Sequence, residues 1–231
     1  MRMIINKLVF TLTALLSIFL SVGQEGKITM QLDAFDEIKV FDGLSVELIR
    51  SDANLIEITG ANTKKVAVVN NKGRLKIRME IDKIFSGYRT FVKVYYTQNL
   101  KIIDVNEDAL LFSEDIIEQP IIDFRAQEGG ELRFNVQSEQ LLAKAVTGGD
   151  IVLSGFTDNQ DIIINTGGSF VGEKFKSKFT TISVNAGGSA TIYATKYVKA
   201  DVKAGGTVQV FGDPEKMDEK TVFGGKIERM D

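Results

Sequence analysis

Hydrophobic and polar residues alternate one by one through most of the chain after residue 33, which is the pattern of half-buried β-strands. The alternation is most regular around a Gly-Gly pair that recurs six times, at successive spacings of 19, 19, 20, 18 and 19 residues. Periods near 20 residues are typical of solenoids, in which units stack because none can bury its apolar face alone. The pattern therefore predicts an all-β fold, a right-handed-type β-solenoid or β-helix with coils of about 19 residues.

The residues flanking each glycine pair keep the same in-and-out order. The second residue after each pair is apolar, whereas the first is polar. The second glycine itself has the inward parity, and only glycine lets the backbone close in at a corner or adopt a positive φ without a Cβ penalty. We predict that the pairs are structural corners and not ligand loops. The corner glycines are Gly129, Gly130, Gly148, Gly149, Gly167, Gly168, Gly187, Gly188, Gly205, Gly206, Gly224 and Gly225.

Weaker repeats precede the glycine pairs. The stretch "NLKIIDVNEDALLFSED" from Asn99 resembles one more coil, with Asp108-Ala109 at the corner. Earlier alternating runs, separated by turn signals such as Asp42-Gly43, predict an N-terminal β layer that caps the solenoid. We expect "DPEKMDEK" from Asp213 to be an outward polar loop, and the charged end "KIERMD" to protect the last sheet edge. The predicted domain is 33–231, comprising the β layer at 33–98 and the coils at 99–231, after a short segment at 24–32.

The first 23 residues have the composition of a secretory signal peptide. Arg2 and Lys7 precede an apolar run of 15 residues, and small residues at 21–23 offer a cleavage point before Gln24. A single transmembrane anchor is the alternative, although a span needs about 20 apolar residues. We predict export to the periplasm or cell surface, with no transmembrane span in the mature chain. Cleavage would leave 26 basic and 31 acidic residues, a net charge of −5, which favours neither nucleic acid nor anionic lipid as a partner.

The residue types present exclude much catalytic chemistry. The chain has no Cys, His or Trp, which rules out thiol nucleophiles, imidazole bases and His- or Cys-based metal sites. The stretch from Gly167 has the glycine spacing of a phosphate-binding loop, but Glu173 replaces the required lysine. Calcium-binding β-rolls need a repeated Gly-x-Asp, and only Asp150 fits. We predict no enzyme activity, no cofactor and no metal. Isolated candidates for acid-base chemistry or sugar stacking are Lys174, Tyr193, Lys196 and Tyr197.

The chain resembles the bacterial family of putative auto-transporter adhesins with a head GIN domain. The resemblance rests on the opening Phe35-Asp36-Glu37-Ile38-Lys39-Val40, on Val46-Glu47-Leu48, on Gly73-Arg74-Leu75-Lys76-Ile77 and on the serial "TGGDI"-like corners. It covers about residue 35 to the C-terminus, and departs from the family in having Gly-Gly where Ser-Gly is common. The resemblance implies export across the inner membrane in a Bacteroidetes-type envelope.

These observations favour an exported, non-catalytic β-solenoid of the cell envelope with an adhesin-like or ligand-binding role. Its partner would be a glycan, a peptide or an envelope protein. Two alternatives stay open, a carbohydrate-active enzyme acting on envelope polysaccharide and a structural envelope component that self-assembles as a homo-oligomer. A fold does not by itself specify its function.

Overall fold

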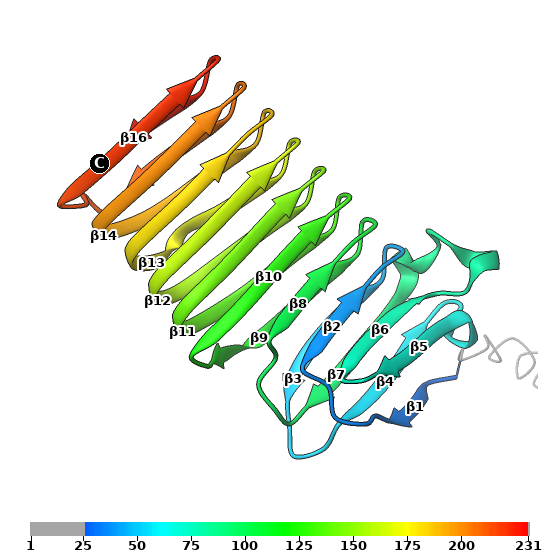
Figure 1. The fold of residues 1–231 in the computed structure, drawn as a ribbon. Helices are drawn as coiled ribbons and strands as arrows, with labels where there is room; N and C mark the ends of the chain where they lie inside the picture. Colours follow the sequence, from blue (N-terminus) through cyan, green and yellow to red (C-terminus); the bar gives the residue numbers. More distant parts are fainter. Residues whose placement is uncertain (1–25, 231) are drawn as a thin grey trace, which may run out of the picture.

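The computed structural model describes residues 26–230, so the predicted signal peptide lies outside the described residues. The chain winds into a two-sided β-solenoid of about seven turns, and the predicted all-β fold with coils of about 19 residues is confirmed (Figure 1). Each coil runs up one side, turns sharply, runs down the other side and bends into the next coil. We call the two sides face 1 and face 2, the sharp corners the turn edge, and the opposite corners the bend edge.

Both faces are continuous ladders of strands that run the length of the stack. Face 1 contains, in spatial order, β5 (Val66–Asn71), β6 (Arg74–Met79), β2 (Glu37–Val40), β8 (Ile102–Val105), β10 (Ile121–Gln127), the second halves of β11 (Glu131–Val146), β12 (Asp150–Asn165), β13 (Ser169–Val184) and β14 (Ser189–Lys203), and β16 (Lys216–Val222). Face 2 contains β1 (Ile28–Gln31), β4 (Leu55–Gly60), β7 (Thr90–Tyr96), β3 (Ser45–Arg50), β9 (Leu110–Glu118), the first halves of β11 to β14, β15 (Thr207–Phe211) and β17 (Lys226–Arg229).

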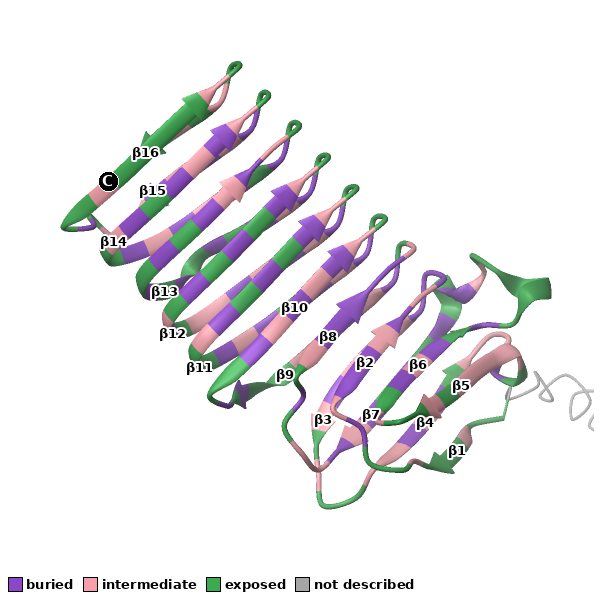
Figure 2. Cartoon of the chain, viewed as in Figure 1, coloured by how far each residue is buried: buried purple, intermediate pink, exposed green. Residues whose placement is uncertain are grey.

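The core lies between the two faces and consists of apolar columns. Inward residues at the same place in successive coils are direct parallel partners, about 4.8 Å apart. In one such column on face 1, every residue is buried and is the direct partner of the next. Figure 2 shows buried residues alternating with more exposed ones along the strands of the stack. The members of this column are Ile103, Phe124, Ala143, Ile162, Ile182 and Ala200.

The N-terminal coil is inserted out of sequence order. Strands β2 and β3 lie between β6–β7 on one side and β8–β9 on the other. Antiparallel pairing of β5 with β6, of β4 with β7, and of β1 with β4 closes this end of the stack. The division of the domain near residue 98 stays a prediction, and hydrogen-bonded strand pairs cross that position on both faces.

The expectation of a polar loop from Asp213 to Lys220 is wrong for most of its length. Strand β16 begins at Lys216 and pairs in parallel with β14, which leaves only residues 212–215 between β15 and β16. Its inward positions are Met217, Glu219 and Thr221, none of them fully buried. Among residues 26–230, the last coil pairs with a neighbour on one side only, so its inward positions are less enclosed and the alternation there is lost.

Each sharp corner of the solenoid is a two-residue type I′ turn. In the coil of β11 and β12, Thr147 and Gly148 have φ of 51° and 73°, and the Gly149 N–H donates to the Val146 carbonyl at 3.0 Å. Positive φ at both central residues defines this turn, whose twist suits the flanking strands. Gly149 has ordinary φ, but a Cβ on it would lie 2.3 Å from the carbonyl carbon of Ala126 in the preceding coil. The geometry thus gives the two glycines different roles, with Gly148 supplying the positive φ and Gly149 leaving space for the preceding coil.

Candidate functional site

At the turn edge, the backbone N–H groups of the glycine pairs before Gly224 all donate hydrogen bonds within the solenoid. The Gly148 N–H donates to the Thr166 carbonyl of the next turn at 3.1 Å, while the Gly149 N–H closes its own turn. The same two bonds recur at the corners that begin at Gly167, Gly187 and Gly205, so both glycine N–H groups are used there. At the last corner the Gly225 N–H closes its turn, and the Gly224 N–H has no backbone acceptor among residues 26–230. Phosphate-binding loops need such groups pointing at the ligand. This geometry supports a structural role for the twelve corner glycines, which remains a proposal until substitutions test it.

The candidate acid-base residues are not brought together. Tyr193 lies on face 2 opposite Phe211, whereas Tyr197 lies on face 1 opposite Lys216. The Tyr197 hydroxyl donates to Asp218 Oδ2 at 2.6 Å, and this hydrogen bond raises the tyrosine pKa and lowers the pKa of the Asp218 carboxyl. Lys196 forms an ion pair with Glu215. Within residues 26–230, no group of three or more acidic side chains is placed to hold a metal ion.

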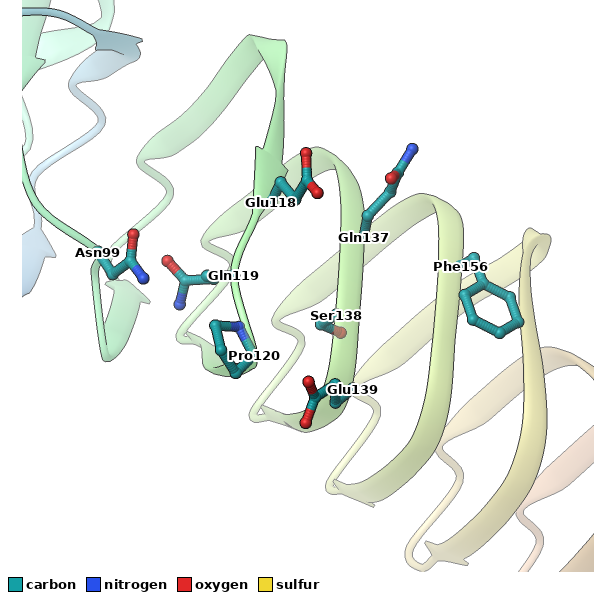
Figure 3. A pocket seen from close by; sticks show the side chains of 8 residues that line it. All are labelled: Asn99, Glu118, Gln119, Pro120, Gln137, Ser138, Glu139 and Phe156. Atoms are coloured by element: carbon teal, nitrogen blue, oxygen red, sulfur yellow. The ribbon is translucent and has the colours of Figure 1, made fainter.

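A groove of about 520 Å³ lies at the bend edge (Figure 3). Gln119 and Pro120 come from the bend between β9 and β10, and Ser138 and Glu139 from the bend within β11. Gln119 is buried and its amide is used internally, because Nε2 donates to the Leu100 and Ile121 carbonyls at 2.8 and 2.6 Å. The outer wall belongs to face 2, where three side chains occupy neighbouring strands in one row. These are Glu118, Gln137 and Phe156.

A second hollow, of about 530 Å³, lies on face 2 between two β-bulges. In β9, residues 113–115 stand opposite the single residue Phe134 of β11, and in β13, residues 172–173 stand opposite Leu153 of β12. Such bulges are rare in parallel pairs and are typical of functional edges, since they re-aim side chains. The hollow between them, which we call the trough, has both charged and apolar lining. Its outward lining residues are Ser113, Arg133, Asn135, Val152, Ser154, Val171, Glu173 and Lys174.

The basic side chains in the trough differ in whether they have an ion-pair partner. Arg133 donates from Nε to Glu131 on the same strand, and this hydrogen bond raises the guanidinium pKa. Lys174, one of the residues expected to be a candidate for chemistry, has no ion-pair partner in the described part of the chain. A ligand in the trough would thus meet one partly neutralised guanidinium, one available ammonium group, the exposed Glu173 carboxylate and amide or hydroxyl groups. This mixture of charged and neutral polar groups suits binding of a polar chain, and Glu173 is the single carboxylate in the lining.

A third hollow, of about 240 Å³, lies on face 2 near the N-terminal end. Its apolar walls are Phe91 on β7, which is 53% exposed, and Phe112 on β9. Two ion pairs cross it, Lys93 Nζ to Glu47 at 3.0 Å and Lys27 Nζ to Glu57 at 2.5 Å. From the sequence alone, we did not single out the exposed aromatic residues of face 2. Phe91 and Phe156 could have been found, because they are large apolar residues at outward positions of the alternation.

The model of the putative auto-transporter adhesin, head GIN domain family matches residues 34–214. The chain belongs to this family. No curated protein matches the sequence. None of the described helices is long and apolar enough to cross a membrane.

Solved structures with the head GIN fold of this chain come from Bacteroides and Parabacteroides. A putative adhesin from Bacteroides fragilis NCTC 9343 superposes with a TM-score of 0.79 at 16% identity, covering 89% of this chain and 98% of its own. A putative adhesin from Parabacteroides distasonis ATCC 8503 gives 0.74 at 16% identity, covering 89% and 96%. A putative lipid binding protein from the same strain gives 0.70 at 17% identity, covering 91% and 98%. At these identities the likeness shows the shared fold, and none of the three is named as an enzyme.

Proposed function

We propose that this head GIN protein is an exported, non-catalytic binding protein of the bacterial envelope, with an adhesin-like role. The observation that carries the proposal is that the three hollows all open on face 2, two of them on the sheet and the third where that sheet meets the bend edge. A single sheet surface with successive hollows suits an extended partner such as a glycan or a peptide. The adhesin names of the family and of two structural neighbours support this assignment.

The test compares matched variants of the two faces in binding to envelope material. Arg133 on β11 and Phe156 on β12 point outward from face 2, while Lys144 and Ile163 point outward from face 1 on the same strands. The immobilised protein would be assayed on a glycan array and in pull-downs from envelope extracts. We expect R133A/F156A to weaken binding at least about tenfold, since buried aromatic and arginine contacts dominate interfaces. K144A/I163A should stay within about twofold of the natural chain. Equal losses in the two variants, or turnover of a polysaccharide, would contradict the proposal.

Export is the second part of the proposal. It is supported by the basic and apolar pattern of residues 1–23 and by the adhesin family. Expression with the natural N-terminus in a Bacteroides host, followed by fractionation, should place the protein outside the cytoplasm with a new N-terminus at Gln24. An unprocessed chain in the cytoplasm would refute export without touching the binding proposal.

Self-assembly is a second candidate function, favoured by one observation. Within residues 26–230, β16 and β17 pair with β14 and β15 on one side only, which leaves their other edge open. Open strand edges are templates for further pairing. Light scattering after size exclusion would show concentration-dependent oligomers if this edge is used, and a strict monomer at high concentration would remove this candidate.

A further inference from the structure

The segment between β6 and β7 covers the N-terminal end of the turn edge, yet its outer surface is apolar. It stands beyond the two faces in Figure 1, and Figure 2 shows it as largely exposed. Ile81, Ile84, Phe85 and Tyr88 are 77, 46, 55 and 58% exposed. The ends of solenoids normally carry a polar outer surface for solubility. Clustered exposed apolar side chains mark sites of interaction. We call residues 81–88 the apical loop.

The apical loop is held in a defined conformation. Phe85 has φ of +57°, which is unusual for a bulky residue and persists only where surrounding contacts impose it. The buried carboxylate of Asp42 accepts hydrogen bonds from the Phe85 and Met79 N–H groups at 3.4 and 3.0 Å, and the Gly87 N–H donates to the Asp42 carbonyl at 3.0 Å. The Tyr88 hydroxyl donates to Asp108 Oδ2 at 3.1 Å. The strained backbone therefore presents Phe85 to solvent at a fixed position.

The segment of the chain that carries the apical loop is rich in basic residues. Residues 61–89 contain eight Lys or Arg and two Asp or Glu, although the whole chain has a net charge of −3. Lys65 bridges both acidic residues, Glu80 and Asp82, at 2.9 and 3.0 Å. Lys83 and Arg89 are exposed beside the apolar side chains and have no ion-pair partner among residues 26–230. Two of the eight, Lys72 and Arg74, lie at the far end of the β5–β6 hairpin, and the Asp42 and Asp108 carboxylates contact the apical loop. The basic groups available at the loop itself are therefore Lys83 and Arg89.

Apolar side chains on a protrusion, flanked by the exposed basic groups of Lys83 and Arg89, match the boundary between anionic headgroups and acyl chains. We propose that the apical loop docks on an anionic lipid bilayer, with Ile81, Ile84 and Phe85 entering the boundary and with Lys83 and Arg89 contacting headgroups. The proposal concerns a surface separate from the hollows of face 2, so it stands or falls independently of the partner bound there. Docking at this end would leave the rest of the solenoid exposed.

The absence of tryptophan allows a position-specific test in the full chain. F85W introduces a single reporter in the apical loop, and F223W introduces one at the opposite end of the stack, where Phe223 is 88% exposed. Each is mixed with vesicles of phosphatidylcholine, with or without phosphatidylglycerol, including a set with brominated acyl chains. We expect a blue shift and bromine quenching for F85W with phosphatidylglycerol present, and neither for F223W. Tryptophan fluorescence reports only on the surroundings of the tryptophan itself. Binding of the vesicle through residues 8–22 would therefore not shift the F85W spectrum and leave the F223W spectrum unchanged.

The basic residues supply a second measurement on the F85W background. Each basic group near an anionic surface should change vesicle partitioning about fivefold. We therefore expect K83Q/R89Q to lower partitioning about 25-fold with the melting temperature unchanged. The matched control K144Q, an exposed lysine on face 1, should change it less than twofold. An unshifted F85W spectrum, equal shifts in F85W and F223W, or equal loss in K144Q and K83Q/R89Q would overturn the proposal.

Discussion

The second glycine of each corner is limited by space, and the space differs between coils. A Cβ on Gly149 would meet backbone atoms of Ala126 at 2.3 Å, whereas one on Gly206 would meet a movable methyl, Val184 Cγ1, at 2.8 Å. We expect G149A to lower the free energy of unfolding by about 3 kcal/mol, the upper part of the usual range for overpacking. G206A should cost clearly less, and urea denaturation of both variants checks the order. Unchanged stability of G149A with lost binding would assign the pair to a ligand.

A carboxyl group at the turn edge makes stability depend on pH. Burial, together with the neighbouring Asp42, raises the pKa of Glu107 above its ordinary value of 4.5. Because the folded pKa is the higher one, the ionised form destabilises the fold at neutral pH, and this cost disappears as pH falls below the ordinary value. E107Q should therefore raise the melting temperature at pH 7 and lose that advantage near pH 4. D161N, an exposed carboxylate on face 1, serves as control, and an equal gain at both pH values would refute the mechanism.

The corner residues show how far sequence reasoning reaches at this scale. Parity alone predicted that the second glycine points into the coil, because side chains in a strand alternate. Parity could not show that the two glycines have different roles. The positive φ of Gly148 depends on the turn type, and the turn type depends on the path of both strands. Parity also gave no sign that Thr147 adopts φ of 51°.

At the scale of strands, the alternation predicted β11 to β14 because both of their neighbours require apolar inward positions. It failed at β16, where one neighbour is absent from the described stack. It could not reveal that β2 and β3 lie between β6–β7 and β8–β9, since an alternating strand has the same pattern whichever strand it pairs with. The bulges that form the trough were equally hidden, because extra residues in a strand are recognised only against a partner's register.

A terminal coil and an internal coil of the solenoid should respond differently to deletion. In a linear stack each coil contacts its neighbours only, so loss of a terminal coil removes one interface. A chain ending at residue 214 should stay folded and lose about 2 to 4 kcal/mol, because β16 and β17 add half-buried side chains such as Met217 and Ile227. Deletion of residues 37–50 removes an internal coil and should abolish cooperative unfolding. Circular dichroism with urea titration distinguishes them, and similar behaviour of both deletions would contradict this account.

At the scale of the whole molecule, totals of charge and composition were the least informative quantities. A net charge of −5 for the predicted mature chain led to the expectation that anionic lipid is not a partner, yet two exposed basic residues, Lys83 and Arg89, flank the apolar side chains of the apical loop. The hollows of face 2 were likewise invisible to composition, since they arise where Phe91, Phe112 and the bulged strands meet in space. The sequence does predict the repeated coil, because equivalent positions in successive coils are constrained by the same packing.

The out-of-order coil has a consequence for the time course of biosynthesis. Strands β2 and β3 are made first, but both of their neighbours, β6–β7 and β8–β9, lie later in the chain. A polypeptide that emerges with its N-terminus leading cannot complete this coil until about residue 118 has appeared. Non-local pairing of this kind is slow to form. We expect the coil of β2 and β3 to stay incomplete until then, which would keep this part of the chain unfolded during the proposed export.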